Sequence, residues 1–153
     1  MIAPNARRGW YLRGRQITTP VNHTREKFCS FGVLGASQFR YRFYDRANSD
    51  SFIDFLKSLR KKYGKVLLFA DNVAYHKSNK VKRYLGSTNG DIVVIHFPSY
   101  TPELNPIEVQ WREIKKNLGN QFFADMEQMK ARINDLLKTG DVPVVKMYEY
   151  LTP

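Results

Sequence analysis

The sequence predicts a single α/β domain over residues 1–153, with a mixed sheet that helices flank on both faces. The chain has 153 residues and 42% of them are hydrophobic, which suffices for one domain with its own core. Apolar residues recur with a period of two in some segments and of three to four in others, as in strands and helices respectively. Strands and a helix alternate in the middle of the chain, which favours a sheet with a crossover connection.

Two strands are expected over 27–36 and 38–44. The second alternates Phe39, Tyr41 and Phe43 with arginines, which is typical of a strand with one buried face. A tight turn near Gly35 separates the two segments, so we expect them to pair in antiparallel fashion.

A helix is expected over 48–63. Asn48 or Ser49 can cap its start, and Gly64 ends it. Its apolar residues share one stripe, which should face the core: Phe52, Phe55, Leu56, Leu59 and Tyr63.

Two continuous apolar runs, at 66–70 and 92–95, the second within an expected strand over 91–96, are separated by a short helix over 77–85. Runs of this kind indicate strands buried on both faces of a sheet. The intervening helix predicts a parallel crossover. Ligands of such sheets lie beyond the carboxyl ends of the strands.

Further helices are expected after the second run. One starts at Asn105, with Pro106 in the first helical position, where its missing N–H costs nothing. Another spans 124–138, and the tail over 142–151 is expected to form one more short helix.

The chain is strongly basic, with 25 Lys and Arg against 14 Asp and Glu and a net charge of +11. This excess favours polyanionic partners, nucleic acid first. In the N-terminal segment arginines surround Trp10, which suits contact with phosphates and bases; the alternative is a loop whose Trp10 covers the core. The candidate DNA-binding residues are Arg7, Arg8, Arg13, Arg15, Lys77 and Lys80.

Cys29 is the one cysteine, so the chain forms no internal disulfide and a reducing compartment is expected. No apolar run approaches the roughly 18 residues of a membrane span. The first ten residues contain no apolar signal core. These observations predict a cytoplasmic, nucleoid-associated protein without a membrane partner.

Asp71 follows the first apolar run, and Glu108 lies in the helix after the second. Carboxylates that converge at one edge of a sheet can hold the Mg²⁺ ions of two-metal phosphoryl transfer. Both residues also have structural interpretations: an Asp-Asn turn for Asp71, and a capping box with Asn105 for Glu108. Spacing alone leaves both interpretations open.

Four other side chains of the sequence are of types that could serve a phosphate or metal site. Asn72 and His76 follow Asp71 closely and could orient phosphate or water, although a histidine near a helix start is often structural. His96 and His23 belong to no recognisable pattern, so no zinc site is predicted.

Two blocks of this sequence resemble DDE transposases of the insertion-sequence branch of the mariner-like superfamily. Residues 71–77 read DNVAYHK, similar to the family's Asp-Asn-Ala-x-x-His block. Residues 97–111 read FPSYTPELNPIEVQW, similar to its Pro-x-Tyr-Ser-Pro-Glu-Leu-Asn-Pro-Ile-Glu block. Residues 9–14 also match a Gly-Trp-x-x-x-Gly segment. The carboxylate separation, 108 − 71 = 37, lies in the family's usual range.

The resemblance implies an RNase H-like fold and metal-dependent cleavage and joining of DNA ends, with Mg²⁺ or Mn²⁺ as cofactor and transposon ends and target DNA as partners. Asp71 would be the second catalytic carboxylate and Glu108 the third. Asn72 and His76 match family positions beside the metal site.

The family's first catalytic Asp lies on a strand upstream of the segment that 4–14 matches. We therefore expect this chain to lack the first core strand, that Asp and the upstream DNA-recognition domain. None of Asp45, Asp50 and Asp54 occupies the expected place. The chain is then the C-terminal part of a transposase, impaired alone, which an upstream transposase fragment or a second copy in a homodimer could complete.

Two alternatives remain open. The chain could be a non-catalytic remnant that binds DNA or full-length transposase. It could also be an RNase H-like nuclease of another family, which cleavage of RNA–DNA hybrids would favour. Metal binding at the two carboxylates separates the transposase from the remnant.

Overall fold

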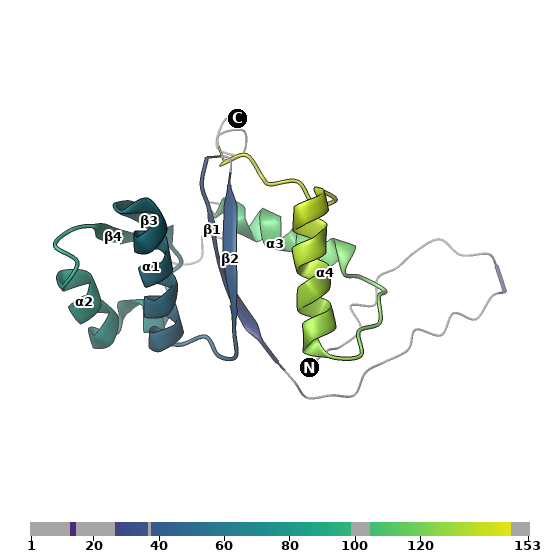
Figure 1. The fold of residues 1–153 in the computed structure, drawn as a ribbon, viewed down its shortest axis with the longest axis horizontal. Coiled ribbons are helices and arrows are strands. Elements are labelled where there is room, and N and C mark those ends of the chain that lie inside the picture. Colours follow the sequence, from purple (N-terminus) through teal and green to yellow (C-terminus); the bar gives the residue numbers. More distant parts are fainter. Residues whose placement is uncertain (1–12, 15–26, 37, 99–104, 148–153) are drawn as a thin grey trace. The chain divides into compact units, whose positions relative to one another are not determined.

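The computed structural model describes residues 13–14, 27–36, 38–98 and 105–147 (Figure 1). The chain divides into two compact units, and each is described by itself. The β3–β4 unit consists of Cys29–Val33 and Arg40–Pro106; the described part of the α3–α4 unit lies within Met1–Phe28, Leu34–Phe39 and Ile107–Pro153. The elements in chain order are β1 (Cys29–Leu34), β2 (Phe39–Tyr44), α1 (Ser49–Tyr63), β3 (Val66–Ala70), the 3₁₀ turn η1 (Ala74–Lys77), α2 (Asn79–Gly86), β4 (Ile92–His96), α3 (Pro106–Asn117) and α4 (Met126–Thr139).

Strands β1 and β2 are hydrogen-bonded neighbours in a two-stranded sheet. The N–H of Gly35 donates to the carbonyl of Gln38 at 2.8 Å, which closes the connection between them. Both strands lie within the segments that the alternating pattern predicted.

Helix α1 begins at the cap that the sequence predicted. The Asn48 side chain accepts hydrogen bonds from the N–H groups of Asp50 and Ser51 at 2.9 and 3.0 Å, and the Ser51 hydroxyl accepts from the Asn48 N–H at 3.0 Å. This capping box satisfies N–H groups that a helix start otherwise leaves unpaired. Gly64, at φ 72°, ends the helix, because glycine adopts positive φ without steric cost.

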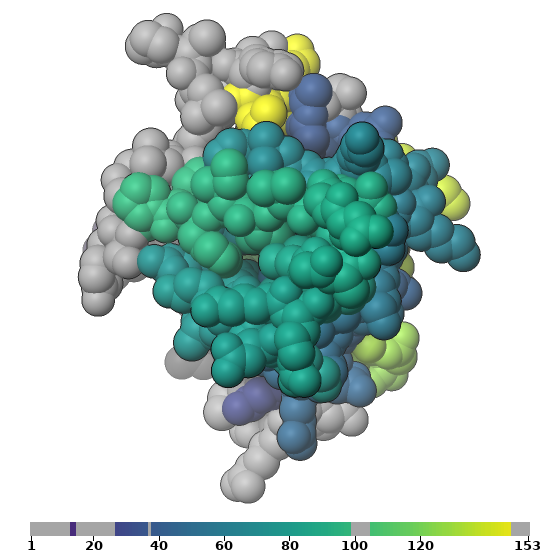
Figure 2. Space-filling model, turned by 90° about the vertical axis from the view of Figure 1, so that its left-hand side faces the viewer, coloured from purple at the N-terminus to yellow at the C-terminus, as the bar shows by residue number. Residues whose placement is uncertain are grey.

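Strands β3 and β4 are parallel, as two strands separated by a helix were expected to be. The register runs from Val66 opposite Ile92 to Ala70 opposite His96. The intervening helix starts at Ser78, whose hydroxyl accepts from the N–H of Val81 at 3.3 Å. Figure 2 shows teal side chains of the α2 region at the surface of this unit.

One face of the β3–β4 pair is covered by the two helices of its unit. Its buried residues pack with those of α1 and α2 in one apolar cluster: Leu68, Ala70 and Ile92 with Phe52, Ile53, Leu56 and Val81. Tyr63 was expected in the buried stripe of α1 but is exposed. It lies in the last turn of the helix, where the Arg40 guanidinium lies 5.6 Å from its ring centroid.

In the described part of the chain, the opposite face of the β3–β4 pair carries exposed apolar side chains. Leu67, Phe69, Val93 and Ile95 are 60%, 53%, 46% and 44% exposed. The expectation that both faces are buried is therefore wrong for this structure. A continuous apolar run shows that a strand can be covered on both faces, but not that a covering layer is present.

The expected single mixed sheet is also absent from the described residues, which form two separate two-stranded sheets, β1–β2 and β3–β4. Each pair follows from a local connection, a tight turn in one case and a helical crossover in the other.

In the α3–α4 unit, Pro106 is the first residue of α3, as predicted. Buried Gln110 donates from Nε2 to the carbonyl of Pro143 at 3.3 Å and accepts from the N–H of Val145 at 2.8 Å. Asp125 caps α4 by accepting from the N–H of Gln128 at 2.8 Å. The expected helix over 142–151 extends into residues outside the described part, and 142–146 are not helical.

The helices of the described ranges are α1 to α4 and the short turn η1. None of the described helices combines the length and the apolar character that crossing a bilayer requires.

Candidate active site

Asp71 lies at the carboxyl end of β3, directly after Ala70. Because Ala70 is opposite His96, the residue that follows β3 lies beside the end of β4. The Asp71 side chain is 54% exposed. A carboxylate in this position can reach a ligand outside the sheet, where ligands of parallel sheets bind.

His76 returns to Asp71 from the 3₁₀ turn η1. Its Nδ1 lies 2.9 Å from the carboxylate Oδ1 of Asp71 and 3.3 Å from the Asp71 carbonyl oxygen. Both oxygens are acceptors, so Nδ1 carries the proton and donates. His76 therefore contacts Asp71, and its predicted role in a site stays a prediction.

The rest of the His76 ring is buried among aromatic side chains, and the residue is 6% exposed. Its ring centroid lies 3.9 Å from that of Phe52, 4.6 Å from that of Tyr75 and 6.1 Å from that of Phe31. Its Nε2 is buried without a hydrogen-bond partner in the described residues.

His96 also contacts Asp71, which sequence reasoning missed. Its Nδ1 lies 3.1 Å from the Asp71 carbonyl oxygen. The rings of His96 and His76 are stacked, with centroids 6.5 Å apart and planes at 20°. The one signal available in the sequence was that His96 ends the second apolar run, as Asp71 follows the first.

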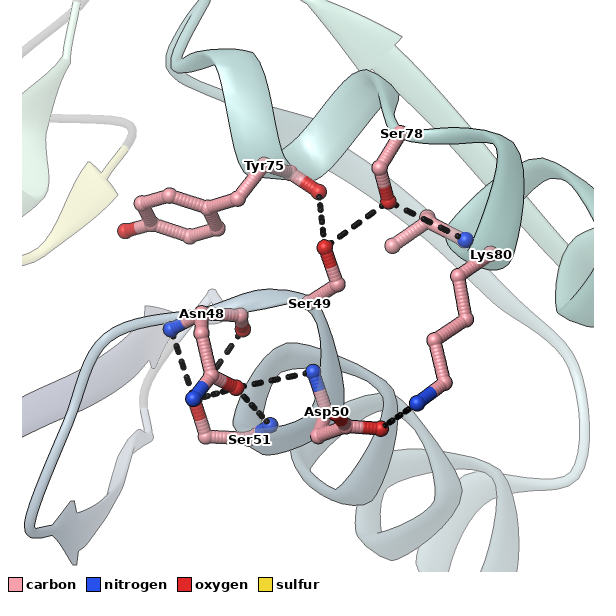
Figure 3. Close-up of polar contacts among 8 residues, drawn as sticks. Asn48, Ser49, Asp50, Ser51, Tyr75, Ser78 and Lys80 are labelled. Carbon is pink, nitrogen blue, oxygen red and sulfur yellow. Dashed lines mark hydrogen bonds and ion pairs between the residues drawn. The ribbon is translucent and has the colours of Figure 1, made fainter.

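The N-terminus of α1 supports the η1 segment from its other side (Figure 3). The Ser49 hydroxyl donates to the carbonyl of Tyr75 at 3.3 Å and shares a hydrogen bond with the Ser78 hydroxyl at 2.8 Å. Asp50 forms an ion pair with Lys80. These contacts connect the segment that carries His76 to a well-capped helix.

The structure describes three of the six predicted DNA-binding residues. Lys77 is exposed at the end of η1, and Arg13 is exposed as well. Lys80 is exposed, but its ammonium group pairs with a carboxylate. The others lie outside the described residues: Arg7, Arg8 and Arg15.

The second predicted carboxylate, Glu108, belongs to the other unit. It is exposed in the first turn of α3, where the helix dipole favours a negative charge. Asp71 and Glu108 therefore belong to different compact units. Asn72 follows Asp71 and is exposed.

Three other acids, Asp45, Asp50 and Asp54, lie directly after β2 or on α1. Asp54 accepts hydrogen bonds from Arg42 at 2.8 Å and from the Tyr44 hydroxyl at 2.9 Å. Asp50 pairs with Lys80, and Asp45 is exposed after β2. Asp50 and Asp54 thus already form ion pairs or hydrogen bonds within the β3–β4 unit.

The fit of a metal ion can be tested at Asp71. The described residues contain no group of three or more His, Cys, Asp and Glu side chains that could hold an ion. Mg²⁺ is nevertheless often bound through one or two carboxylates, with water and phosphate oxygens completing its shell. An exposed carboxylate with one oxygen already hydrogen-bonded fits such an ion as a single ligand.

Comparison with protein families gives the class of this protein. A model of the DDE superfamily endonucleases matches residues 2–130. The match covers most of the chain, so the chain belongs to this family. No match was found among curated proteins.

Two solved structures are similar to the chain. The crystal structure of the Mos1 strand transfer complex has a TM-score of 0.71 at 18% identity and covers 97% of this chain and 46% of the Mos1 chain. The Mos1 mariner paired end complex with Mn gives 0.68 at 16% identity, with the same coverage of both chains. The chain therefore shares its mixed α/β fold with them and spans less than half of their length.

Proposed function

We propose that this chain is the C-terminal part of a DDE transposase catalytic domain with an RNase H-like fold, which cleaves and joins DNA strands. The observation that carries the proposal is the Asp71 carboxylate, exposed at the end of β3 and hydrogen-bonded to His76 at 2.9 Å. It lies within the segment that matches the DDE family. The similarity to a Mos1 mariner paired end complex with Mn supports a divalent cation as cofactor.

The proposed ligands of Mg²⁺ or Mn²⁺ are Asp71 and Glu108, and Asn72 follows Asp71 in the chain. When bound by these residues, a divalent cation would supply Lewis-acid stabilisation for the attacking and leaving oxygens of a phosphate. His76 fixes the Asp71 carboxylate, and Lys77 and Arg13 contact the DNA backbone. Transposon ends and target DNA are the proposed substrates.

The remaining carboxylate of the triad comes, in this proposal, from outside residues 1–153. Asp50 and Asp54 are engaged in contacts within their own unit, so neither substitutes for it. An upstream transposase segment or a second copy of the chain would supply it.

The test is nicking of supercoiled plasmid DNA in Mg²⁺ or Mn²⁺ by the chain, alone and with an upstream segment of a related transposase. Nicking that needs the upstream segment and disappears in Asp71→Asn and Glu108→Gln is the expected result. Asp141→Asn and Glu113→Gln are the matched controls, because they change exposed or half-exposed acids that have no proposed role. Nicking that survives in Asp71→Asn would refute the assignment.

A second candidate is a non-catalytic DNA-binding or transposase-binding chain. The net charge of +11 favours it, because a basic surface binds DNA without any metal. It predicts salt-sensitive DNA binding that Asp71→Asn and Glu108→Gln leave unchanged, with no Mn²⁺ binding that depends on either residue.

A further inference from the structure

We propose that His76 and His96 are paired positioning residues that hold Asp71 in one conformation and direct its second carboxylate oxygen, Oδ2, toward the cation. This inference rests on the proposed function, because it assumes that Asp71 is a metal ligand. It adds His96 to the site and gives both histidines the same task.

The contacts of Asp71 fix its main chain and its side chain together. Its carbonyl oxygen lies 3.3 Å from the Nδ1 of His76 and 3.1 Å from the Nδ1 of His96. Its Oδ1 lies 2.9 Å from the Nδ1 of His76. The His76 imidazole thus contacts both the main-chain carbonyl and the carboxylate of Asp71. These contacts restrict rotation of the carboxylate about its side-chain torsions. They therefore lower the entropy cost of ordering the carboxylate when a ligand binds.

Two different elements supply these donors. His76 belongs to η1 and His96 ends β4, so the carbonyl of Asp71 is approached from the crossover and from the neighbouring strand. The stacked arrangement of the two rings, at 20°, keeps both Nδ1 atoms near the same oxygen. Asp71 is therefore held by the register of the sheet as well as by its own loop.

The chemistry of the donor suits a metal ligand. A lysine or arginine at this position would orient the carboxylate but would also place a positive charge beside the cation. A neutral imidazole donates its N–H and leaves the negative charge of the carboxylate available.

The contacts use Nδ1 in both histidines, and this allows a matched test. The amide nitrogen of asparagine is attached to Cγ, as Nδ1 is, whereas the amide nitrogen of glutamine lies one atom further out, near the position of Nε2. His76→Asn and His96→Asn therefore keep the donor near Asp71, and His76→Gln and His96→Gln displace it.

The measurement is Mn²⁺ affinity of the full chain, from the electron paramagnetic resonance signal of free Mn²⁺, with Asp71→Asn as the baseline. Loss of a hydrogen-bonding partner of a metal ligand typically weakens binding about 10–100-fold. We expect a loss of this size in His76→Gln and of about tenfold in His96→Gln, with both asparagine variants within about threefold of wild type. Urea midpoints of all variants, taken without metal, report on folding.

The outcomes separate the inference from the proposed function. If Asp71→Asn binds Mn²⁺ as well as wild type does, Asp71 is not a ligand and both fail. If Asp71→Asn loses affinity but the glutamine variants do not, the inference alone is overturned. Equal losses in the asparagine and glutamine variants, or losses that follow the urea midpoints, also overturn it, because they would show a merely structural role.

Discussion

The Tyr44 hydroxyl donates to Asp54 at 2.9 Å, and the Arg42 guanidinium binds the same carboxylate oxygen at 2.8 Å. This cluster connects β2 to the exposed side of α1. Partial burial raises the pKa of Tyr44 to about 12, and the hydrogen bond and charge of Asp54 add to the shift. The Arg42 guanidinium acts in the opposite direction but does not cancel them.

This pKa gives a prediction about alkaline stability. An unfolded tyrosine ionises near 10 and folded Tyr44 near 12, so between these values the unfolded state holds fewer protons. The stabilisation from Tyr44 is complete below pH 10 and is lost as the pH rises through about 12. We expect the free energy of unfolding of Tyr44→Phe to fall less than that of wild type between about pH 9 and about pH 11 in urea titrations.

The control for this measurement is Tyr63→Phe, which changes an exposed tyrosine at the end of α1. If Tyr44→Phe loses as much stability as Tyr63→Phe does, the contact with Asp54 has no influence on alkaline unfolding.

At the same scale, the sequence predicted the position of Asp71 but not that of His96. Asp71 ends an apolar run, which is a local signal. His96 reaches Asp71 because Ala70 is opposite it in the parallel pair, and strand register depends on packing between segments that are distant in the chain. The roles of Asp71, Glu108 and Asn72 stay predictions.

Among the elements, the best-predicted features were those with chemical signals in the chain itself. Asn48 begins α1, and Pro106 is the first residue of α3. Helix α4 begins at Met126, two residues later than expected, because Asp125 caps it. The sheet was predicted less well, since no local signal shows whether β1 joins β3 or whether a layer covers the second face of β3–β4.

The one-sided core gives a prediction at the scale of the element. Leu56 of α1 is fully buried at 0% exposure, whereas Leu67 of β3 is 60% exposed. Leu56→Ala should lower the free energy of unfolding by about 2–5 kcal/mol, because it removes apolar contacts and leaves a cavity. Leu67→Ala should cost less than about 1 kcal/mol, as an exposed substitution does.

Urea unfolding measures the loss of stability in both variants. The comparison is matched, because both variants replace leucine by alanine. Equal losses would mean that another surface covers Leu67 in solution. A loss confined to Leu56→Ala would support a core built by α1 and α2 on one face.

At the scale of the whole molecule, the net charge of +11 dominates what can be expected of the chain in solution. Binding to DNA through phosphates weakens steeply with salt, because each neutralised phosphate releases counterions. The division into two compact units leaves the single domain over 1–153 as a prediction. The contribution of single surface charges to DNA binding, by contrast, can be tested by substituting one residue at a time.

The two predicted lysines of the η1–α2 region should differ in this test. Lys77→Gln should weaken binding to all DNA sequences and lower the salt slope by about 1. Lys80→Gln should change it less, because Lys80 already pairs with Asp50. Fluorescence anisotropy over a range of salt concentrations measures both slopes.

Lys138→Gln is the matched control for charge, since Lys138 lies at the exposed end of α4 and has no proposed contact. A slope change in Lys138→Gln as large as that in Lys77→Gln would show that binding senses total charge rather than a surface near Asp71.

The open face of β3–β4 has a practical consequence for handling the protein. Within the described residues these two strands pair only with each other, so each strand has one edge without a neighbouring strand. Their segments, VLLFA and IVVIH, contain no proline, lysine or acidic residue. Such segments are prone to pair between copies and aggregate. The net charge of +11 keeps copies apart at low ionic strength, and salt screens it. High salt would dissociate DNA from the protein during purification. The same high salt therefore promotes precipitation of the protein.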